Sequence, residues 1–218
     1  MPITRLCLVR HGETEWNAEG RVQGQTDIPL SALGLAQARA AAEVLCRHDF
    51  STIYSSDLMR VRQTAEPSAH KLALPLQLDP ALRERHYGIF ERLLYTEVRS
   101  RYPEHYERFH RKDPDYDFES GESLRTFYER ALGVVKSIAA RHAGEQVLVF
   151  THGGVLEMVY RYAREVGLSS PRDFGIPNCG VNWVEVSARG WDVQCWADIG
   201  HLEVHAAEDS VEGVKRGG

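Results

Sequence analysis

The chain has 218 residues, of which 43% are hydrophobic and 26% are charged, so it is long enough to bury a core of its own. Its formal net charge of -5 offers no overall attraction for nucleic acid, and no apolar run approaches the ~18 residues of a membrane span. Four widely spaced cysteines without a C-x-x-C pair, and an N-terminus without the layout of a signal peptide, indicate a reducing compartment. We therefore expect a cytoplasmic protein that binds neither nucleic acid nor membranes.

Strands and helices alternate from the start of the chain. An apolar run at residues 6–9 predicts a buried strand, and a glycine-rich loop follows it. Ser31 is a suitable N-cap for the next helix. The apolar face of this helix should contain four residues at helical spacing: Leu33, Ala36, Ala40 and Val44.

The next segments continue the alternation. Residues 51–56, STIYSS, predict a second strand, and a helix should open near Asp57. Pro67 lies within the helical pattern, where we expect it to kink or end the helix, because proline removes a backbone hydrogen bond. Leu76 and Leu78 then predict a short edge strand.

The second half of the chain contains a different kind of segment. Residues 83–121 are charged, rich in tyrosine and histidine, and only weakly periodic, so we interpret them as an inserted helical cap. Apolar residues at helical spacing over 124–142 predict a long helix, which Gly144 stops. Residues 145–151 predict another apolar strand, and residues 181–197 predict a two-stranded hairpin.

The pattern as a whole predicts an α/β fold. We expect one domain at residues 1–205, with the cap inserted at about 83–121, and a polar, frayed tail over residues 206–218. The sequence shows no internal repeat and no low-complexity segment that would divide the chain further.

Two of the predicted strands lead directly into a histidine followed by glycine. Arg10 and His11 follow the first strand, and His152 and Gly153 follow the later one. Because parallel strands present their carboxyl ends at one edge of a sheet, we expect both histidines to converge there. Arg60, in the first turn of the helix after the second strand, should join them. A single Arg-His pair at a strand end has a structural explanation, but this convergence favours an anion site.

Six sequence blocks in order along the chain resemble the histidine phosphatase superfamily, also called phosphoglycerate-mutase-like. They are LVRHGETEWN, GRVQGQTDIPLSALGLAQA, YSSDLMRVRQTAE, LRERHYGIFE, SGES and FTHGG, and the resemblance runs from Leu6 to about His201. It implies a three-layer α/β/α sandwich with a mixed, mostly parallel sheet of about six strands and a small helical cap over the active site. It also implies phosphoryl transfer that needs no metal and no other cofactor.

The resemblance assigns a role to each residue of the expected site. His11 becomes the nucleophile that takes the phosphoryl group, and Glu84 becomes the general acid and base. Four side chains would bind the phosphoryl oxygens: Arg10, Asn17, Arg60 and His152. Gln23, Gly24 and Gly153 would bind substrate beside them.

These residue types suit phosphoryl transfer. A phosphoryl group in transfer spreads negative charge over three oxygens, which two guanidiniums and an imidazolium, that of His152, can stabilise. His11 must be neutral at its attacking nitrogen, so its other nitrogen must donate to a fixed acceptor such as a main-chain carbonyl. Glu84 must protonate the leaving oxygen and then deprotonate the attacking water.

Several of these residues also have structural interpretations. Glu84 lies in a charged stretch, where it could be a surface glutamate. Gln23 and Gly24 fit a plain turn equally well, and a salt bridge beside a helix explains Glu13.

Other features lie outside the main motifs. His201 and His205 have a spacing that zinc sites sometimes use, but no cysteine or carboxylate partner is evident nearby, so we expect no metal there. The basic cluster at residues 106–112 is interpreted as a solvated cap helix rather than a ligand clamp. Arg92 stands where the family usually has glycine, and we expect it either to crowd the cap hinge or to add a cation at the pocket rim.

Three functions remain open at this point. The first is a phosphomonoesterase that acts on a small phosphorylated metabolite and releases inorganic phosphate. The second is a phosphoglycerate mutase, and the third is a non-catalytic binding protein on the same fold, which the complete set of expected site residues disfavours. A metallohydrolase built from His11, His152 and Glu84 is a further alternative, but Arg10 and Arg60 would repel a cation.

Cap length and one glycine favour hydrolysis over mutase activity. Mutases of the family usually carry a longer basic cap and an asparagine after the second His-Gly, whereas here Gly154 follows. The sequence does not identify the substrate. It leaves the oligomeric state open as well, with the C-terminal hairpin or an edge strand as a surface for a possible homodimer.

Overall fold

One six-stranded sheet organises the protein. A computed structural model describes residues 2–202, and His205 and the expected tail at 206–218 lie outside these. The strand order is β3-β2-β4-β1-β5-β6, with β3, β2, β4 and β1 parallel and β5 and β6 antiparallel to their neighbours. The strands are β1 (Thr4–Arg10), β2 (Thr52–Ser55), β3 (Leu76–Leu78), β4 (Gln146–Thr151), β5 (Val181–Ser187) and β6 (Gly190–Asp198).

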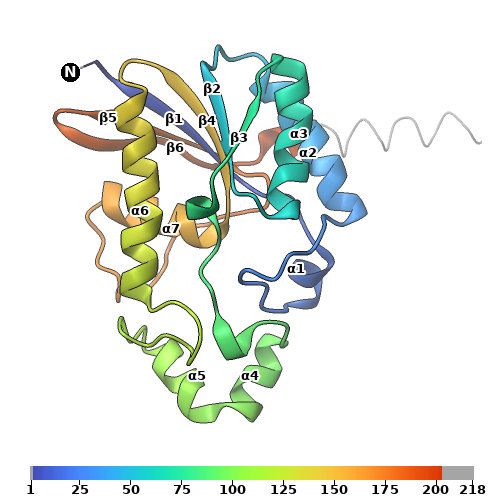
Figure 1. The fold of residues 1–218 in the computed structure, drawn as a ribbon, viewed down its shortest axis with the longest axis vertical. Helices are drawn as coiled ribbons and strands as arrows, with labels where there is room; N and C mark the ends of the chain where they lie inside the picture. Colours follow the sequence, from blue (N-terminus) through green and yellow to red (C-terminus); the bar gives the residue numbers. More distant parts are fainter. Residues whose placement is uncertain (1, 203–218) are drawn as a thin grey trace, which may run out of the picture.

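Helices cover both faces of the sheet (Figure 1). They are α2 (Ala32–Leu45) and α3 (Met59–Leu72) on one face, and α6 (Leu124–Arg141) and α7 (Gly153–Ala163) on the other. Residues 6–9 of β1 are all apolar because both faces of the strand are buried. Leu6 and Leu8 belong to the core on the α6–α7 side, and Cys7 and Val9 belong to the core on the α2–α3 side. The predicted three-layer α/β/α sandwich with a mixed, mostly parallel sheet is confirmed.

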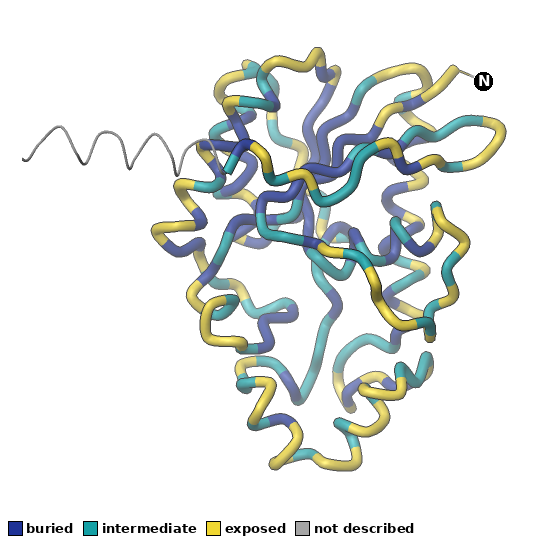
Figure 2. The backbone as a smooth tube through the Cα atoms, turned by 180° about the vertical axis from the view of Figure 1, so that it is seen from behind, coloured by how far each residue is buried: buried dark blue, intermediate teal, exposed yellow. Residues whose placement is uncertain are grey.

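A group of short helices lies apart from these layers, beyond the carboxyl edge of the parallel strands (Figure 1). They are η2 (Gly88–Phe90), α4 (Tyr95–Arg101) and α5 (Pro103–His110); η1 (Pro80–Leu82) leads into them, and α1 (Glu15–Glu19) lies between β1 and α2. A small separate core holds this cap together: Val22, Phe90, Val98, Tyr116 and Phe118. Figure 2 shows that the rest of the cap is largely exposed or half-buried, in contrast to the buried strands.

The apolar face predicted for α2 is half right: Ala40 is buried and Val44 packs against the core. Leu33 and Ala36 are exposed, whereas Gly34 and Ala38 are buried. The helix packs through small residues because it lies very close to the chain that follows β1: a Cβ atom on Gly34 would collide with the backbone of Glu13. Leu33 and Ala36 therefore indicated the wrong side of the helix.

Pro67 does not end α3, contrary to one of the two expected outcomes. The helix, Met59–Leu72, continues past the proline without interruption. A proline in a helix interior costs about 3 kcal/mol. Buried side chains on both sides of it, among them Val61 and Ser68, keep the helix packed on the protein.

Other boundaries differ only slightly from the predictions. Ser31 caps α2 as expected, and its hydroxyl accepts a hydrogen bond from the Gly34 amide at 3.0 Å. Helix α3 begins at Met59, two residues after Asp57, so its predicted start near Asp57 is confirmed; the Asp57 carboxylate accepts a hydrogen bond from Arg83 at 2.7 Å.

The remaining predicted elements are present: the edge strand β3, the hairpin of β5 and β6, and the long helix α6. Helices α1 and α7 were not predicted. In the part of the chain that the structure describes, no helix is both long and apolar enough to cross a membrane.

Candidate active site

Two histidines lie side by side at the carboxyl edge of the sheet. Strands β1 and β4 are parallel neighbours with Arg10 opposite Thr151, so the next residues, His11 and His152, are brought together. Their ring centroids are 5.3 Å apart and the rings meet edge to face at 65°. The predicted convergence of the two strand ends is confirmed.

His11 is held as a neutral ring. Its Nδ1 atom lies 2.7 Å from the Gly12 carbonyl oxygen, to which it donates, so Nε2 keeps a free electron pair. Burial lowers the pKa of His11 well below its usual value, and the charges of Arg60 and Arg10 lower it further. This is the arrangement that the sequence analysis required of a nucleophilic histidine.

Two arginines, the buried Arg60 and the half-buried Arg10, lack carboxylate ion pairs within residues 2–202. Arg10 donates to the Ile176 carbonyl at 2.6 Å, and Arg60 donates to the carbonyls of Gly24 and Thr26 at 2.8 and 3.0 Å. The Nε atom of each arginine is buried without a hydrogen-bond partner among the described residues. Burial lowers the pKa of Arg10, and it lowers the pKa of Arg60 to about 10, so both remain charged at neutral pH. Two such charges favour an anion between them.

His152 has the hydrogen-bond pattern of a neutral ring, whereas the sequence analysis expected an imidazolium that binds the phosphoryl group. Its Nδ1 atom accepts a hydrogen bond from Arg60 Nη2 at 3.2 Å, and its Nε2 atom donates to the hydroxyl of Ser56 at 2.9 Å. Burial lowers the pKa of His152 well below its usual value, helped by the charges of Arg60, His11 and Arg10. Ser56 follows the end of β2, the strand next to β4, and the sequence analysis missed it.

A cavity of about 120 Å³ lies at this edge of the sheet, and neither His152 nor Ser56 lines it. Seven expected site residues line it: Arg10, His11, Asn17, Gln23, Gly24, Arg60 and Glu84. Five further residues line it and were not predicted: Trp16, Gly20, Arg21, Tyr87 and Tyr95. Trp16 comes from α1 and the tyrosines from the cap, where no periodicity indicated them. Gly153 lies behind this wall, where a Cβ atom would come within 3.5 Å of Arg10 Nε.

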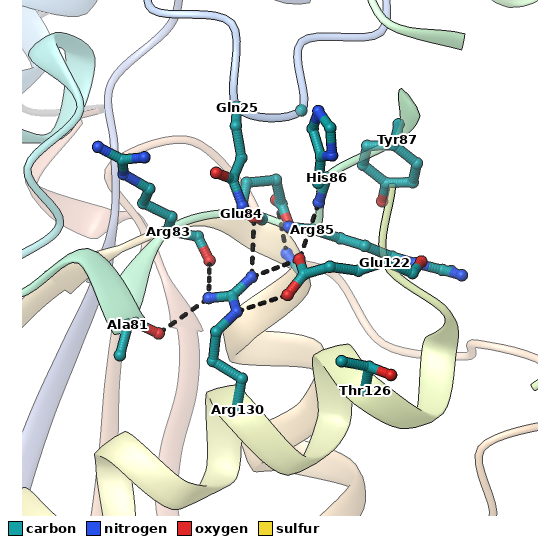
Figure 3. Close-up of polar contacts among 12 residues, drawn as sticks. Gln25, Ala81, Arg83, Glu84, Arg85, His86, Tyr87, Glu122, Thr126 and Arg130 are labelled. Atoms are coloured by element: carbon teal, nitrogen blue, oxygen red, sulfur yellow. Dashed lines mark hydrogen bonds and ion pairs between the residues drawn. The ribbon is translucent and has the colours of Figure 1, made fainter. Parts of the chain in front are cut away.

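Glu84 reaches the cavity from the segment after η1 (Figure 3). Its carboxylate accepts hydrogen bonds from the amides of Gly154, at the start of α7, and Arg85, at 2.9 and 2.8 Å. Its negative charge raises the pKa values of Arg10 and Arg60 against the effect of burial. Glu84 therefore faces the two arginines and is not an isolated surface glutamate.

The loop before α2 fixes Arg60. Gly24 has a φ of +55°, a conformation that favours glycine, and a Cβ atom there would collide with the carboxylate of Glu91. This turn directs the Gly24 carbonyl at Arg60. Gln23 is buried, and its Oε1 atom has no hydrogen-bond partner among the described residues. Gln23 and Gly24 therefore form a structural turn and also line the cavity.

Two open questions from the sequence concern Glu13 and Arg92. The Glu13 carboxylate accepts a hydrogen bond from the Ser31 hydroxyl at 3.2 Å, at the start of α2. Arg92 has a φ of +71°, the conformation for which glycine is best suited, and its side chain is exposed. Its backbone amide donates to the Val22 carbonyl at 2.8 Å. Arg92 does not line the cavity, so it adds no cation to the rim.

A second cavity of about 320 Å³ adjoins the first, and Tyr87 and Tyr95 line both. Its walls come from the cap, α6, α7 and the loop after α7. Lys112, from the basic cluster expected to be solvated, lines this cavity. Glu157 and Arg172 also line it, with charged atoms 3.7 Å apart. This space is amphipathic and carries both signs of charge.

Only one of the two histidines considered as metal ligands, His201 and His205, lies among the described residues. His201 is buried, and His205 lies outside the described residues. Within residues 2–202, no group of three or more His, Cys, Asp or Glu side chains is placed to hold a metal ion.

An α/β/α sandwich with two histidines and two arginines at this edge of its sheet defines a class, the phosphoglycerate-mutase-like enzymes. The chain belongs to the histidine phosphatase superfamily (branch 1), whose family model matches residues 6–199. The predicted family is confirmed, and with it the assignment of the chain as a phosphatase-type enzyme.

Individual proteins show the same relationship over nearly the whole chain. A metal-independent phosphoserine phosphatase of Arabidopsis thaliana is 37% identical, over 92% of this chain and 84% of its own. Phosphoglycerate mutase-like protein 4 of the same plant is 39% identical, over 91% and 86%. The solved structure of Bacillus stearothermophilus YhfR superposes with a TM-score of 0.84 at 34% identity, covering 91% of this chain and 99% of YhfR.

Proposed function

We propose that the protein is a metal-independent phosphomonoesterase that passes the phosphoryl group of a small metabolite to His11 and then to water. The observation that carries the proposal is the pair of charged arginines, the half-buried Arg10 and the buried Arg60, beside a neutral His11 whose Nδ1 atom is hydrogen-bonded to a carbonyl. The relationship to a metal-independent phosphoserine phosphatase supports the same chemistry.

The first step forms a phosphohistidine. The free electron pair on His11 Nε2 attacks phosphorus as the bond to the leaving oxygen breaks, and that oxygen takes a proton from the Glu84 carboxyl group. Arg10 and Arg60 stabilise the negative charge on the three other phosphoryl oxygens. The free alcohol then leaves through the second cavity.

The second step regenerates the enzyme. The Glu84 carboxylate takes a proton from a water molecule as its oxygen attacks phosphorus, and the electron pair of the P–N bond returns to His11 Nε2. Inorganic phosphate is released. His152 holds Arg60 by accepting its N–H group.

The second cavity supports a zwitterionic leaving group. It adjoins the phosphoryl site through Tyr87 and Tyr95, and it offers a cation, Arg172, next to a carboxylate, Glu157. A serine leaving group carries one carboxylate and one ammonium group, which these two charges complement. Phosphoserine, the substrate in the name of the Arabidopsis relative, is therefore the substrate we propose first.

A phosphomonoester screen tests the proposal. Purified protein with excess chelator should release phosphate from phosphoserine faster than from an uncharged alkyl phosphate. 3-Phosphoglycerate with its bisphosphate primer tests the mutase hypothesis in parallel. Isomerisation faster than phosphate release from the best monoester would make the enzyme a mutase, and loss of all activity with chelator would contradict metal independence.

A further inference from the structure

One arginine outside both cavities uses every N–H donor that it has. Arg130, on α6, donates from Nε and Nη2 to the Glu122 carboxylate at 2.7 and 2.6 Å. Its Nη1 atom donates to the carbonyls of Ala81 and Arg83, both at 2.9 Å, and Nη2 also donates to the Glu84 carbonyl at 3.1 Å. These are five hydrogen bonds, the full capacity of a guanidinium group. Figure 3 shows this fan of contacts around the arginine head group.

The three carbonyls belong to the segment that carries Glu84. This segment consists of the single-turn helix η1 and the residues between η1 and η2, and it is not part of the sheet, so no regular ladder of hydrogen bonds sets its path. Side chains set it instead: besides Arg130, the Thr151 hydroxyl donates to the Leu82 carbonyl at 2.8 Å, and Gln25 donates to the Glu84 carbonyl at 3.1 Å. The position of the Glu84 carboxylate depends on these contacts.

Glu122 holds the other side of the same segment. Its carboxylate accepts from the His86 amide at 2.9 Å, its amide donates to the His86 carbonyl at 2.9 Å, and its carbonyl accepts from Arg85 Nε at 2.9 Å. The preceding Gly121 allows this close approach, since a Cβ atom there would collide with the His86 carbonyl. Arg130 and Glu122 together form hydrogen bonds with the chain before and after Glu84.

The pair is charged and largely shielded from water. The side chains of Arg130 and Glu122 are 22% and 16% exposed. Burial alone would raise the pKa of Glu122, but the hydrogen bonds from Arg130 and the His86 amide outweigh it and lower that pKa. Glu122 therefore stays ionised, and removal of either partner would leave a half-buried charge unpaired.

We infer that the Arg130–Glu122 pair is a positioning unit for Glu84: it sets the reach of the Glu84 carboxylate toward the leaving oxygen and does not touch the substrate. Neither residue lines the phosphoryl cavity or the second cavity. The inference rests on the proposed function, because it assumes that Glu84 is the acid. Lysine cannot replace Arg130, since its ammonium group has three donors for five acceptors.

The first experiment compares two substrates that differ in their need for an acid. Arg130→Met removes all five hydrogen bonds. A shift of Glu84 of the order of 1 Å should lower kcat/KM, which reports the first step alone, by roughly 10²-fold on an alkyl phosphate. On 4-nitrophenyl phosphate, whose leaving oxygen needs little protonation, the loss should be severalfold smaller. Arg125→Met is the matched control: Arg125 is on the same helix and is paired at the surface with Asp115, 58% and 67% exposed.

A double mutant separates this inference from the proposed function. If Arg130 acts through Glu84, Arg130→Met should add little to Glu84→Gln on the alkyl phosphate, whereas independent effects would multiply. Arg130→Lys should recover only part of the loss. If Arg130→Met does not fold, Glu122→Gln replaces it in the experiment and should likewise lose more activity on the alkyl phosphate than on 4-nitrophenyl phosphate.

Each outcome has a separate meaning. Equal losses on both substrates in Arg130→Met, or multiplicative losses in the double mutant, would overturn the positioning role. Equal losses on both substrates in Glu84→Gln would instead overturn the proposed role of Glu84 itself.

Discussion

The two ends of the active site are built in different ways. The phosphoryl end is formed where β1, β2 and β4 end, and its charged groups are tied to main-chain carbonyls or to each other. The leaving-group end is formed by the cap and by irregular segments, which depend on side chains such as Arg130 for their shape. Rigid strand ends suit chemistry common to all substrates, and a cap packed around its own small core can vary with the alcohol.

The largest expected effect is at the phosphoryl end. Arg60→Met should lower kcat by on the order of 10²–10³-fold on every phosphomonoester, because it removes a charge contact to the transferring group. The loss should be similar for alkyl and aryl substrates. Arg62→Met, an exposed position on the same helix, is the control for folding and expression. A loss confined to one class of leaving group would mean that Arg60 acts at the leaving-group end and not at the phosphoryl end.

The boundary between the two ends lies at Gly154. A Cβ atom there would collide with the Glu84 carboxylate, so Gly154→Ala should displace the acid and slow alkyl phosphates by about tenfold or more. Aryl phosphates should lose less. Gly133→Ala is the control, because nothing lies within 4 Å of its added Cβ, and it should stabilise α6 by up to about 1 kcal/mol. Equal turnover of both substrates by Gly154→Ala and wild type would show that Glu84 has room to adjust.

The leaving-group end should control specificity alone. Arg172→Met removes one cation of the second cavity, the one paired with Glu157, and should raise KM for phosphoserine about tenfold, the effect of one lost charge contact. The rate on 4-nitrophenyl phosphate should hardly change. Steady-state kinetics on the two substrates make the comparison, and equal changes in KM for both would remove Arg172 from substrate recognition.

The smallest effect concerns stability against pH. The pKa values of His11 and His152 are both lowered by burial, so the folded protein keeps these rings neutral while the unfolded chain binds protons below about pH 6.5. Stability should therefore fall as pH decreases from about 6.5 towards the lowered pKa values, by up to about 1.4 kcal/mol per pH unit for each ring. Urea denaturation at pH 7, 6 and 5 should show a shallower fall in His152→Asn. An unchanged slope would mean that this ring is not buried as a neutral group.

The sequence predicted that His11 and His152 converge because its signals there are local. An apolar strand that ends in His-Gly marks His11 and His152, and parallel strands bring such ends together. The neutral state of His152 was not predictable, because it depends on Arg60 and Ser56, which are distant in sequence.

The rest of the site escaped prediction for related reasons. Tyr87 and Tyr95 lie in irregular cap segments without periodicity, and Arg130 looked like any polar residue on a helix. The first half of the α2 face was mispredicted because close backbone packing selected Gly34 over Leu33. Contacts that join distant segments, rather than local patterns, decide these positions.

The most direct test of the account is to trap the intermediate on His11. Wild-type protein mixed rapidly with ³²P-labelled substrate and quenched in alkaline detergent should carry label that is stable in base and lost in acid. Peptide mapping should place it on His11, and His11→Ala should show neither label nor turnover. Normal turnover by His11→Ala, or label on a different residue, would contradict the account.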